Sequence, residues 1–244
     1  MSRSILVLGA NSDIARACAH RYAQDGYAVR LAARDTNALA SDVTDIALRH
    51  RVDATAHAFD ALDTPGFAAF LDALPELPDT VLCAVGFMGE QDQSQTDPDA
   101  AARVLRSNFE GPALILGLLA ERFEARGSGT IIGISSVAGD RGRASNYVYG
   151  AAKAGFTAFL SGMRNRFARS DIHVMTVKPG FVATRMTEGL DLNPRLTAQP
   201  DEVADAIFAA QTKRRNVIYV KPLWRWIMTI IRVLPEVVFK KTSL

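Results

Sequence analysis

Short apolar segments rich in β-branched residues alternate with longer segments of helical periodicity along the chain. Near-continuous apolar strands that alternate with helices are typical of a parallel sheet covered on both faces. The pattern therefore predicts an α/β Rossmann fold, in which helices flank a doubly wound, seven-stranded parallel sheet. The predicted strands cover residues 4–10, 27–33, 53–59, 79–85, 129–135, 172–178 and 216–221.

Helix boundaries agree with this alternation. Ser12 can cap the first helix, which ends at Gly26. A long helix is predicted over 96–126, and Pro112 should kink it or open it locally because proline lacks an N–H. The chain contains no linker rich in Pro, Gly or Ser, so we predict a single domain over residues 1–244.

The composition narrows the function classes. A net charge of +2 over 244 residues gives no reason to expect nucleic acid as a partner. The two cysteines lie in a predicted helix and a predicted strand, which argues against a disulfide framework and favours the cytoplasm. The chain does not open on a signal-peptide pattern, and its four histidines are scattered, so we expect neither export nor a metal site.

The C-terminal part carries an uneven share of the charge. Residues 213–244 contain eight Lys or Arg and one Glu, a net charge of +7, so the preceding 212 residues carry −5. Within it, segment 222–244 mixes tryptophans and aliphatic residues with basic ones, and it is too short and too charged to span a bilayer. A basic amphipathic helix of this kind can lie on the inner, anionic face of a membrane. Packing on the domain or on a second subunit explains the pattern equally well.

The turn between the first strand and the first helix is a candidate phosphate site. It brings free backbone N–H groups to the positive end of a helix dipole, which suits a pyrophosphate. An ordinary turn, with Gly9 present for its backbone angle, is the alternative, because Gly9 is the only glycine there. The candidate cofactor-binding residues in this turn are Gly9, Asn11, Ser12, Asp13 and Ile14.

Arg34 follows the second strand, where this fold binds the adenosine ribose of a dinucleotide. Folds selective for NAD(H) place an acidic residue there, whereas a guanidinium suits the 2′-phosphate of NADP(H). The sequence therefore favours NADP(H), and NAD(H) stays an alternative because Asp35 is adjacent. A surface arginine paired with a carboxylate would also explain Arg34.

The segment "NYVYGAAKAG" (146–155) contains two tyrosines and one lysine. Positions i and i+4 share one face of a helix, so Tyr149 and Lys153 can point into one cleft while Tyr147 points elsewhere. A nearby ammonium stabilises a phenolate, so we expect Lys153 to lower the pKa of Tyr149 from about 10. Tyr149 is then a candidate proton donor, although tyrosine and lysine at this spacing are commonly structural.

Ser135 and Ser136 end the fifth predicted strand. Doubly wound folds bind ligands at this carboxyl edge of the sheet. A hydroxyl there can hydrogen-bond a substrate carbonyl and stabilise the charge that develops on its oxygen.

With these motifs in one order and at compatible spacing, nearly the whole chain resembles the short-chain dehydrogenase/reductase family. In that family a serine lies thirteen residues before the catalytic tyrosine, which selects Ser136 here, and an asparagine of the long helix is matched by Asn108. The glycine-rich "TGxxxGxG" of the family is residues 8–15 here, with Asp13 and Ala15 in place of two glycines.

The resemblance implies that a nicotinamide cofactor reduces a ketone to a secondary alcohol. Tyr149 would pass a proton to the substrate oxygen, Ser136 would hold that oxygen, and Lys153 would also bind the nicotinamide ribose. Asn108 would anchor a water of the proton relay. The further cofactor contacts that it implies are Ala84, Val85, Gly86, Pro179, Gly180, Val182 and Thr184, with Asp60 and Ala61 near the adenine.

One subgroup, the decaprenylphosphoryl-2-keto-erythro-pentose reductases, shares local patterns with this chain. They include "GxxSDIA", "FDALDT", "VKPGFVATRM" and the aromatic and basic tail. These enzymes reduce a keto-sugar joined through phosphate to a polyprenol, a substrate that would account for the basic tail. The alternatives are a soluble ketone, a keto-sugar nucleotide, a 3-oxoacyl thioester, and a nucleotide-sensing protein without catalysis.

The resemblance also bears on assembly and on the substrate lid. Family members pair through helices that correspond to residues 99–126 and 147–169, so we expect a homodimer or homotetramer. Residues 185–199 occupy the place of the mobile substrate lid.

Overall fold

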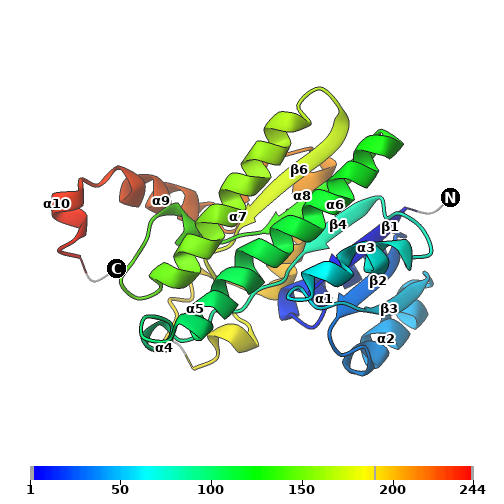
Figure 1. Ribbon diagram of the computed structural model, residues 1–244, viewed down its shortest axis with the longest axis horizontal. Coiled ribbons are helices and arrows are strands. Elements are labelled where there is room, and N and C mark those ends of the chain that lie inside the picture. The colour runs from blue at the N-terminus through cyan, green and yellow to red at the C-terminus, as the bar shows by residue number, and fades with distance from the viewer. Residues whose placement is uncertain (1–2, 190, 243–244) are drawn as a thin grey trace.

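The seven apolar segments form the strands of one parallel sheet, in the order β3-β2-β1-β4-β5-β6-β9. This computed structural model describes residues 3–189 and 191–242 (Figure 1). The strands are β1 (Ser4–Leu8), β2 (Ala28–Ala33), β3 (Ala54–Ala58), β4 (Thr80–Cys83), β5 (Ser128–Ile134), β6 (Asp171–Lys178) and β9 (Val217–Tyr219). Each falls within one predicted segment or begins one residue before it, so the predicted doubly wound α/β fold is confirmed.

Side chains alternate along the strands between two hydrophobic cores. In β1, Ile5 and Val7 belong to one core, while Leu6 and Leu8 belong to the other. The first core is covered by α1 (Asp13–Gln24), α2 (Ala40–His50) and α8 (Pro200–Thr212). The second is covered by α3 (Phe67–Asp72), α6 (Gly111–Arg126) and α7 (Tyr147–Arg166). Burial on both faces explains why the central strands are continuous apolar segments in the sequence.

The long helix predicted over 96–126 is interrupted near its middle. It consists of α5 (Pro98–Leu105), a π-helical turn at Arg106–Glu110, and α6; the short α4 (Gln91–Ser94) precedes it. Pro112 has no N–H to donate to the carbonyl of Asn108, so regular α-helical bonding cannot continue through this turn. The predicted local opening is therefore confirmed.

The strand order reverses between β1 and β4, which is where open α/β sheets bind ligands. Beyond the carboxyl end of β6, the chain forms a small second sheet in which β7 (Phe181–Val182) pairs with β8 (Thr197–Ala198). The segment between these two strands begins with a 3₁₀ turn at Arg185–Thr187. This segment includes most of the predicted substrate lid.

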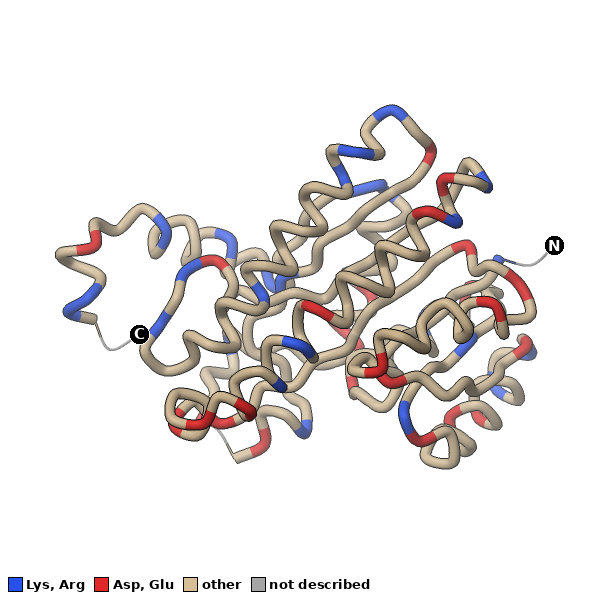
Figure 2. The backbone as a smooth tube through the Cα atoms, viewed as in Figure 1, with Lys and Arg blue, Asp and Glu red and all other residues tan. Residues whose placement is uncertain are grey.

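The C-terminal segment forms α9 (Leu223–Val233) and α10 (Glu236–Phe239) at one end of the molecule (Figure 1). Trp224, Met228 and Ile231 of α9 are buried against the turns that follow β5 and β6. One face of this helix therefore packs on the domain. Figure 2 shows several basic residues and one acidic residue along α9 and α10. Among residues 3–189 and 191–242, no helix has the length and apolar character needed to cross a membrane.

Candidate active site

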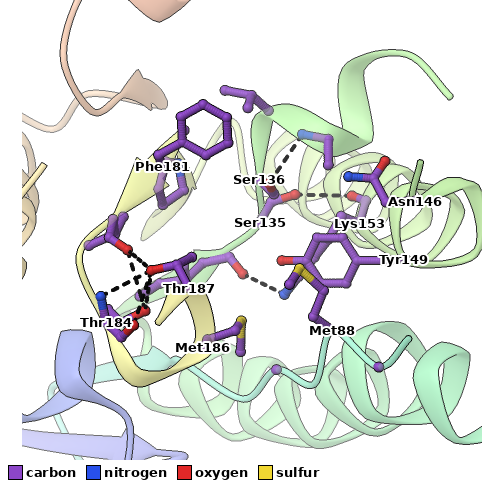
Figure 3. Close-up of a pocket in the computed structure, with 18 of the residues that line it drawn as sticks. Met88, Ser135, Ser136, Asn146, Tyr149, Lys153, Phe181, Thr184, Met186 and Thr187 are labelled. Carbon is purple, nitrogen blue, oxygen red and sulfur yellow. Dashed lines mark hydrogen bonds between the residues drawn. The ribbon is translucent and has the colours of Figure 1, made fainter. Parts of the chain in front are cut away.

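A cleft of about 810 Å³ opens beyond the carboxyl ends of β1, β4, β5 and β6 (Figure 3). Its walls come from the segments that follow these strands and from α7 and α9. The predicted site residues that line it are Ser12, Asp13, Ile14, Ala84, Val85, Gly86, Ser136, Tyr149, Lys153, Pro179, Gly180, Val182 and Thr184. Those outside its lining are Gly9, Asn11, Arg34, Asp60, Ala61 and Asn108.

Tyr149 and Lys153 enter the cleft from the first turns of α7 (Figure 3). The Lys153 ammonium lies 5.7 Å from the centroid of the Tyr149 ring and donates to the carbonyl of Ile134 at 3.1 Å. Tyr147, two residues earlier, is 45% exposed and does not line the cleft. The helical spacing thus separates the two tyrosines in the way that the sequence predicts.

The expected effect of Lys153 on the phenol is not found. Burial raises the pKa of Tyr149 to about 12, and the neighbouring Ser136 hydroxyl opposes that rise only in part. Burial also lowers the pKa of Lys153 to about 8. Loss of water around each side chain therefore outweighs the attraction between them. Tyr149 remains protonated at neutral pH, which suits a proton donor better than a base.

The two serines at the end of β5 have different surroundings. Ser135 is buried, donates to the carbonyl of Lys153 at 3.0 Å and hydrogen-bonds the Thr157 hydroxyl at 2.7 Å. Its hydroxyl therefore ties β5 to α7. The Ser136 hydroxyl accepts from the Ala138 N–H at 3.1 Å. Of the two, Ser136 is the one whose hydroxyl lowers the pKa of Tyr149.

Asn108 is fully buried in the π-helical turn. Its carboxamide accepts from the Phe87 N–H at 3.2 Å and donates to the carbonyls of Phe87 and Val104 at 2.6 and 2.8 Å. The side chain therefore fixes the loop that follows β4 to the helix that crosses beneath it. Both N–H donors of the carboxamide are thus taken by backbone carbonyls, which leaves one acceptor position on its oxygen.

The turn between β1 and α1 has features that fit a dinucleotide. Gly9 has a φ of +79°, and a Cβ there would lie 2.8 Å from the backbone nitrogen of Val85. Ser12 caps α1 by accepting from the Ala15 N–H at 3.1 Å. The buried Oδ1 of Asn11 has no hydrogen-bond partner among the described residues. A left-handed glycine, an open helix N-terminus and an unpaired acceptor suit a pyrophosphate with a neighbouring ribose hydroxyl.

Asp13, which replaces a family glycine, is paired with the lid. Its carboxylate accepts from the backbone N–H of Arg185 at 2.9 Å and from its Nε at 3.1 Å. The same guanidinium donates to the carbonyl of Asn11. The arginine therefore compensates the negative charge with which Asp13 would repel a diphosphate. It also joins the start of the lid to the turn between β1 and α1.

Arg34 is exposed after β2, and neither an ion pair nor a hydrogen bond of its side chain occurs within the described ranges. Asp35 accepts from the Asn37 N–H at 2.9 Å, so its carboxylate serves the local turn. Asp60 is exposed after β3 and accepts from the Leu62 N–H at 3.0 Å, while the adjacent Ala61 is buried. These positions can extend the site from the cleft toward an adenosine.

Several residues that line the cleft were not assigned a role from the sequence. Trp224 of α9 covers Gly180, where a Cβ would lie 2.0 Å from the indole ring. A glycine followed at a distance by a tryptophan gives no sequence signal, because only the fold brings them together. The other unassigned polar residues in the lining include Gln91, Arg143 and Asn146.

Comparisons with known proteins identify a family whose model covers most of this chain. The family model for short chain dehydrogenase matches residues 3–194. An uncharacterized oxidoreductase of Mycobacterium tuberculosis is 30% identical over 97% of this chain and 96% of its own length. The cis-4-hydroxycyclohexanecarboxylate dehydrogenase of Sinomonas cyclohexanicum is 33% identical over 84% of this chain and 87% of its own length.

The fold is also that of solved short-chain dehydrogenases. The enzyme from Sphingobium yanoikuyae, determined in complex with NADPH, matches with a TM-score of 0.82 and 22% sequence identity, over 96% of this chain and 97% of that one. The chain therefore belongs to the short-chain dehydrogenase family and is an NAD(P)-dependent oxidoreductase.

Proposed function

We propose that this short-chain dehydrogenase reduces a ketone to a secondary alcohol, with Tyr149 as the proton donor. The observation that carries the proposal is that Ser136, Tyr149 and Lys153 line one cleft, with Lys153 one helical turn beyond Tyr149 on α7. Bound nicotinamide supplies the hydride. Ser136 holds the carbonyl oxygen, and Tyr149 donates its proton as negative charge develops on that oxygen.

The cofactor that we propose is NADP(H). The residues that would hold its pyrophosphate and nicotinamide are Gly9, Asn11, Ser12, Ile14, Ala84, Val85, Gly86, Pro179, Gly180, Val182 and Thr184. Lys153 would donate to the hydroxyls of the nicotinamide ribose, and Asp60 and Ala61 would meet the adenine. The exposed and unpaired guanidinium of Arg34 supports a 2′-phosphate, because the neighbouring Asp35 is already bonded within its own turn.

The substrate that we propose is a keto-sugar carried on a polyprenyl phosphate. The subgroup patterns and the basic tail support this choice. The test follows nicotinamide absorbance with a polyprenylphosphoryl 2-keto-pentose, cyclohexanone and a 3-oxoacyl thioester, each with NADPH and NADH. We expect the lipid-linked sugar with NADPH to give the highest kcat/KM. A higher value for a soluble ketone would replace the substrate, and cofactor binding without turnover of any ketone would favour a nucleotide sensor.

The second candidate substrate is a ring alcohol or ketone that bears a carboxylate. The relative from Sinomonas cyclohexanicum, named for cis-4-hydroxycyclohexanecarboxylate, favours it. The matching ketone, 4-oxocyclohexanecarboxylate, is tested in the same assay.

The C-terminal helix presents a second apolar face, which supports contact with the cytoplasmic surface of a membrane. Leu223, Trp226, Ile230 and Val233 of α9 lie on one side of the helix and are 51 to 74% exposed. This face is distinct from the buried side that contains Trp224. Tryptophan and aliphatic side chains on such a face suit the boundary between lipid headgroups and acyl chains.

The charge around this face supports anionic lipid rather than a second copy of the chain. Arg225, Arg232, Lys240 and Lys241 are exposed, while the carboxylate of Glu236 is paired with Arg141 at 2.9 Å. Two copies meeting through this face would bring like charges together. Negatively charged headgroups would instead compensate them.

Replacing Trp226 by Gln should weaken vesicle binding by about tenfold, because the indole no longer enters the interface. The measurement is co-sedimentation with phosphatidylcholine vesicles that contain phosphatidylglycerol. Thr229→Gln, which exchanges one exposed polar side chain of the same helix for another, is the matched control and should bind like the wild type. Equal binding of all three proteins, or no dependence on phosphatidylglycerol, would contradict membrane contact.

Exposed leucines on α5 and α6 support a homo-oligomer. Leu105, Leu114 and Leu118 are 40 to 48% exposed on the helices through which the family resemblance predicts pairing. We expect light scattering to give a dimer or tetramer, and Leu114→Glu to lower that mass because a carboxylate would be buried in the interface. Leu48→Glu, on α2 and 76% exposed, is the control that should keep the mass of the wild type. A monomeric wild type at micromolar concentration would refute the prediction.

A further inference from the structure

Three polar side chains in the lining of the cleft each contain a buried atom without a partner. They are Nε of Arg143, Oδ1 of Asn146 and Nε2 of Gln91, and none of them has a hydrogen bond within the described part of the chain. Arg143 and Asn146 precede α7, and Gln91 begins α4. All three residues therefore belong to the lining beside Tyr149, and none is among the predicted cofactor contacts.

Arg143 is the most unusual of the three. Its Nη2 contacts the sulfur of Met228 at 3.2 Å, and no carboxylate forms an ion pair with the guanidinium among residues 3–189 and 191–242. Burial lowers the pKa of Arg143, although the nearby Asp140 opposes that shift. The carboxylate of Asp140 is itself taken by Lys178 and by the Tyr219 hydroxyl, which donates to it at 2.7 Å. The guanidinium thus keeps its positive charge without an anionic partner of its own.

Gln91 and Asn146 each have one buried polar atom without a hydrogen-bond partner among the described residues. The Oε1 of Gln91 accepts from the Val148 N–H at 3.3 Å, which fixes the amide and leaves its Nε2 as a free donor. Asn146 is the residue directly before α7, its side chain makes no capping hydrogen bond, and Figure 3 shows it beside the phenol of Tyr149. Its Oδ1 is a free acceptor. The pair therefore offers one donor and one acceptor, the combination that binds hydroxyl groups.

A buried polar atom without a partner destabilises the fold, so each of these atoms calls for a partner from outside the chain. A water can satisfy a single atom of this kind. A guanidinium, an amide donor and an amide acceptor that line one cleft with the proton donor match a more specific ligand. A guanidinium binds phosphate and carboxylate oxygens through paired hydrogen bonds.

We propose that Arg143, Asn146 and Gln91 recognise the substrate as a hydroxylated ketone that bears an oxyanion, either a phosphate ester or a carboxylate. Arg143 binds the oxyanion, while Asn146 and Gln91 bind hydroxyl groups. This inference rests on the proposed function, because it assumes a ketone whose carbonyl reaches Ser136 and Tyr149. The inference adds that the substrate carries a negative charge, placed on the side of the reacting carbon that faces Arg143.

The test compares Arg143→Met with the wild type on three ketones. They are a prenylphosphoryl 2-keto-pentose with a short chain, 4-oxocyclohexanecarboxylate, and uncharged cyclohexanone. We expect the variant to lose about 100-fold in kcat/KM on the anionic ketone that the wild type prefers, and less than about threefold on cyclohexanone. The two anionic ketones separate phosphate from carboxylate as the natural group. Arg169→Met, at an exposed arginine outside the cleft, is the control and should match the wild type on all three.

A binding measurement separates failure of the inference from failure of the proposed function. With NADP⁺ present, D-ribose 5-phosphate should quench the fluorescence of Trp224, which lines the same cleft. Its Kd should rise at least tenfold in Arg143→Met, whether or not any ketone is reduced. Equal losses on charged and uncharged ketones, or an unchanged Kd for the sugar phosphate, would overturn the inference. A wild type that reduces none of the ketones but shows the shift in Kd would instead overturn the proposed function.

Discussion

Tyr149→Phe should lower kcat for ketone reduction by about 1000-fold, because the variant keeps the ring but has no proton to donate. The dissociation constant for NADPH should change by less than about twofold, since the lost hydroxyl acts on the substrate oxygen. Single-turnover absorbance of the nicotinamide measures the chemical step, and fluorescence titration measures cofactor binding. A loss confined to kcat would identify Tyr149 as a group that acts in the transition state.

Tyr147→Phe is the matched control for this substitution. It removes the same hydroxyl from the same helix at a position that is exposed and outside the cleft. We expect its kcat to equal that of the wild type within about twofold. Similar losses in both variants would indicate damage to the start of α7, and retention of turnover in Tyr149→Phe would refute the proposed proton donor.

Lys153→Met should lower kcat/KM by about 100-fold and remove the alkaline limb of the pH profile. Burial lowers the pKa of Lys153 from 10.5 to about 8, so its ammonium is present at pH 7 and is lost as the pH rises through about 8. We therefore expect wild-type kcat/KM to be constant below this value and to fall above it. Tyr149 contributes no limb in this range, because its pKa of about 12 lies higher.

The thermal stability of Lys153→Met separates a catalytic role of Lys153 from a purely structural one. A purely structural role predicts a large decrease in the midpoint of thermal unfolding. Methionine replaces a buried ammonium by an apolar group of similar length, so the midpoint of thermal unfolding at pH 7 should not decrease by more than a few degrees. Weaker NADPH binding with an intact fold would agree with a contact to the cofactor ribose. An alkaline limb that persists in Lys153→Met would assign the titration near pH 8 to another group.

The strands and the central residues of the site could be predicted because short-range rules govern them. Strands buried on both faces need continuous apolar residues, and those segments were visible in the sequence before any contact was known. The four-residue interval between Tyr149 and Lys153 fixes a common helix face, and the carboxyl end of an inner strand places Ser135 and Ser136 at the edge where ligands bind. The resemblance to the family selected Ser136 from this pair. Pro112 predicted the local opening of its helix because the missing N–H is a property of that residue alone.

The protonation of the site could not be predicted from the same residues. The spacing of Tyr149 and Lys153 suggested that the ammonium would make the phenol more acidic. The fold buries both groups, and burial raises the pKa of one and lowers that of the other. Desolvation depends on every segment packed around a side chain, so the spacing of two residues on one helix cannot predict it.

The sequence by itself determined the fold, because the periodicity of its apolar segments predicts strands and helices. Its motifs carried the resemblance to the family and, through it, to the residues around the candidate proton donor. The tertiary structure decided which charges are paired: it joined Asp13 to Arg185, placed Trp224 over Gly180 and left Arg143 in the cleft without an anionic partner. Hydrogen bonding and charge compensation act over a few ångströms between residues far apart in the chain. Only the folded arrangement of strands and loops could therefore reveal the guanidinium on which the proposed anion site rests.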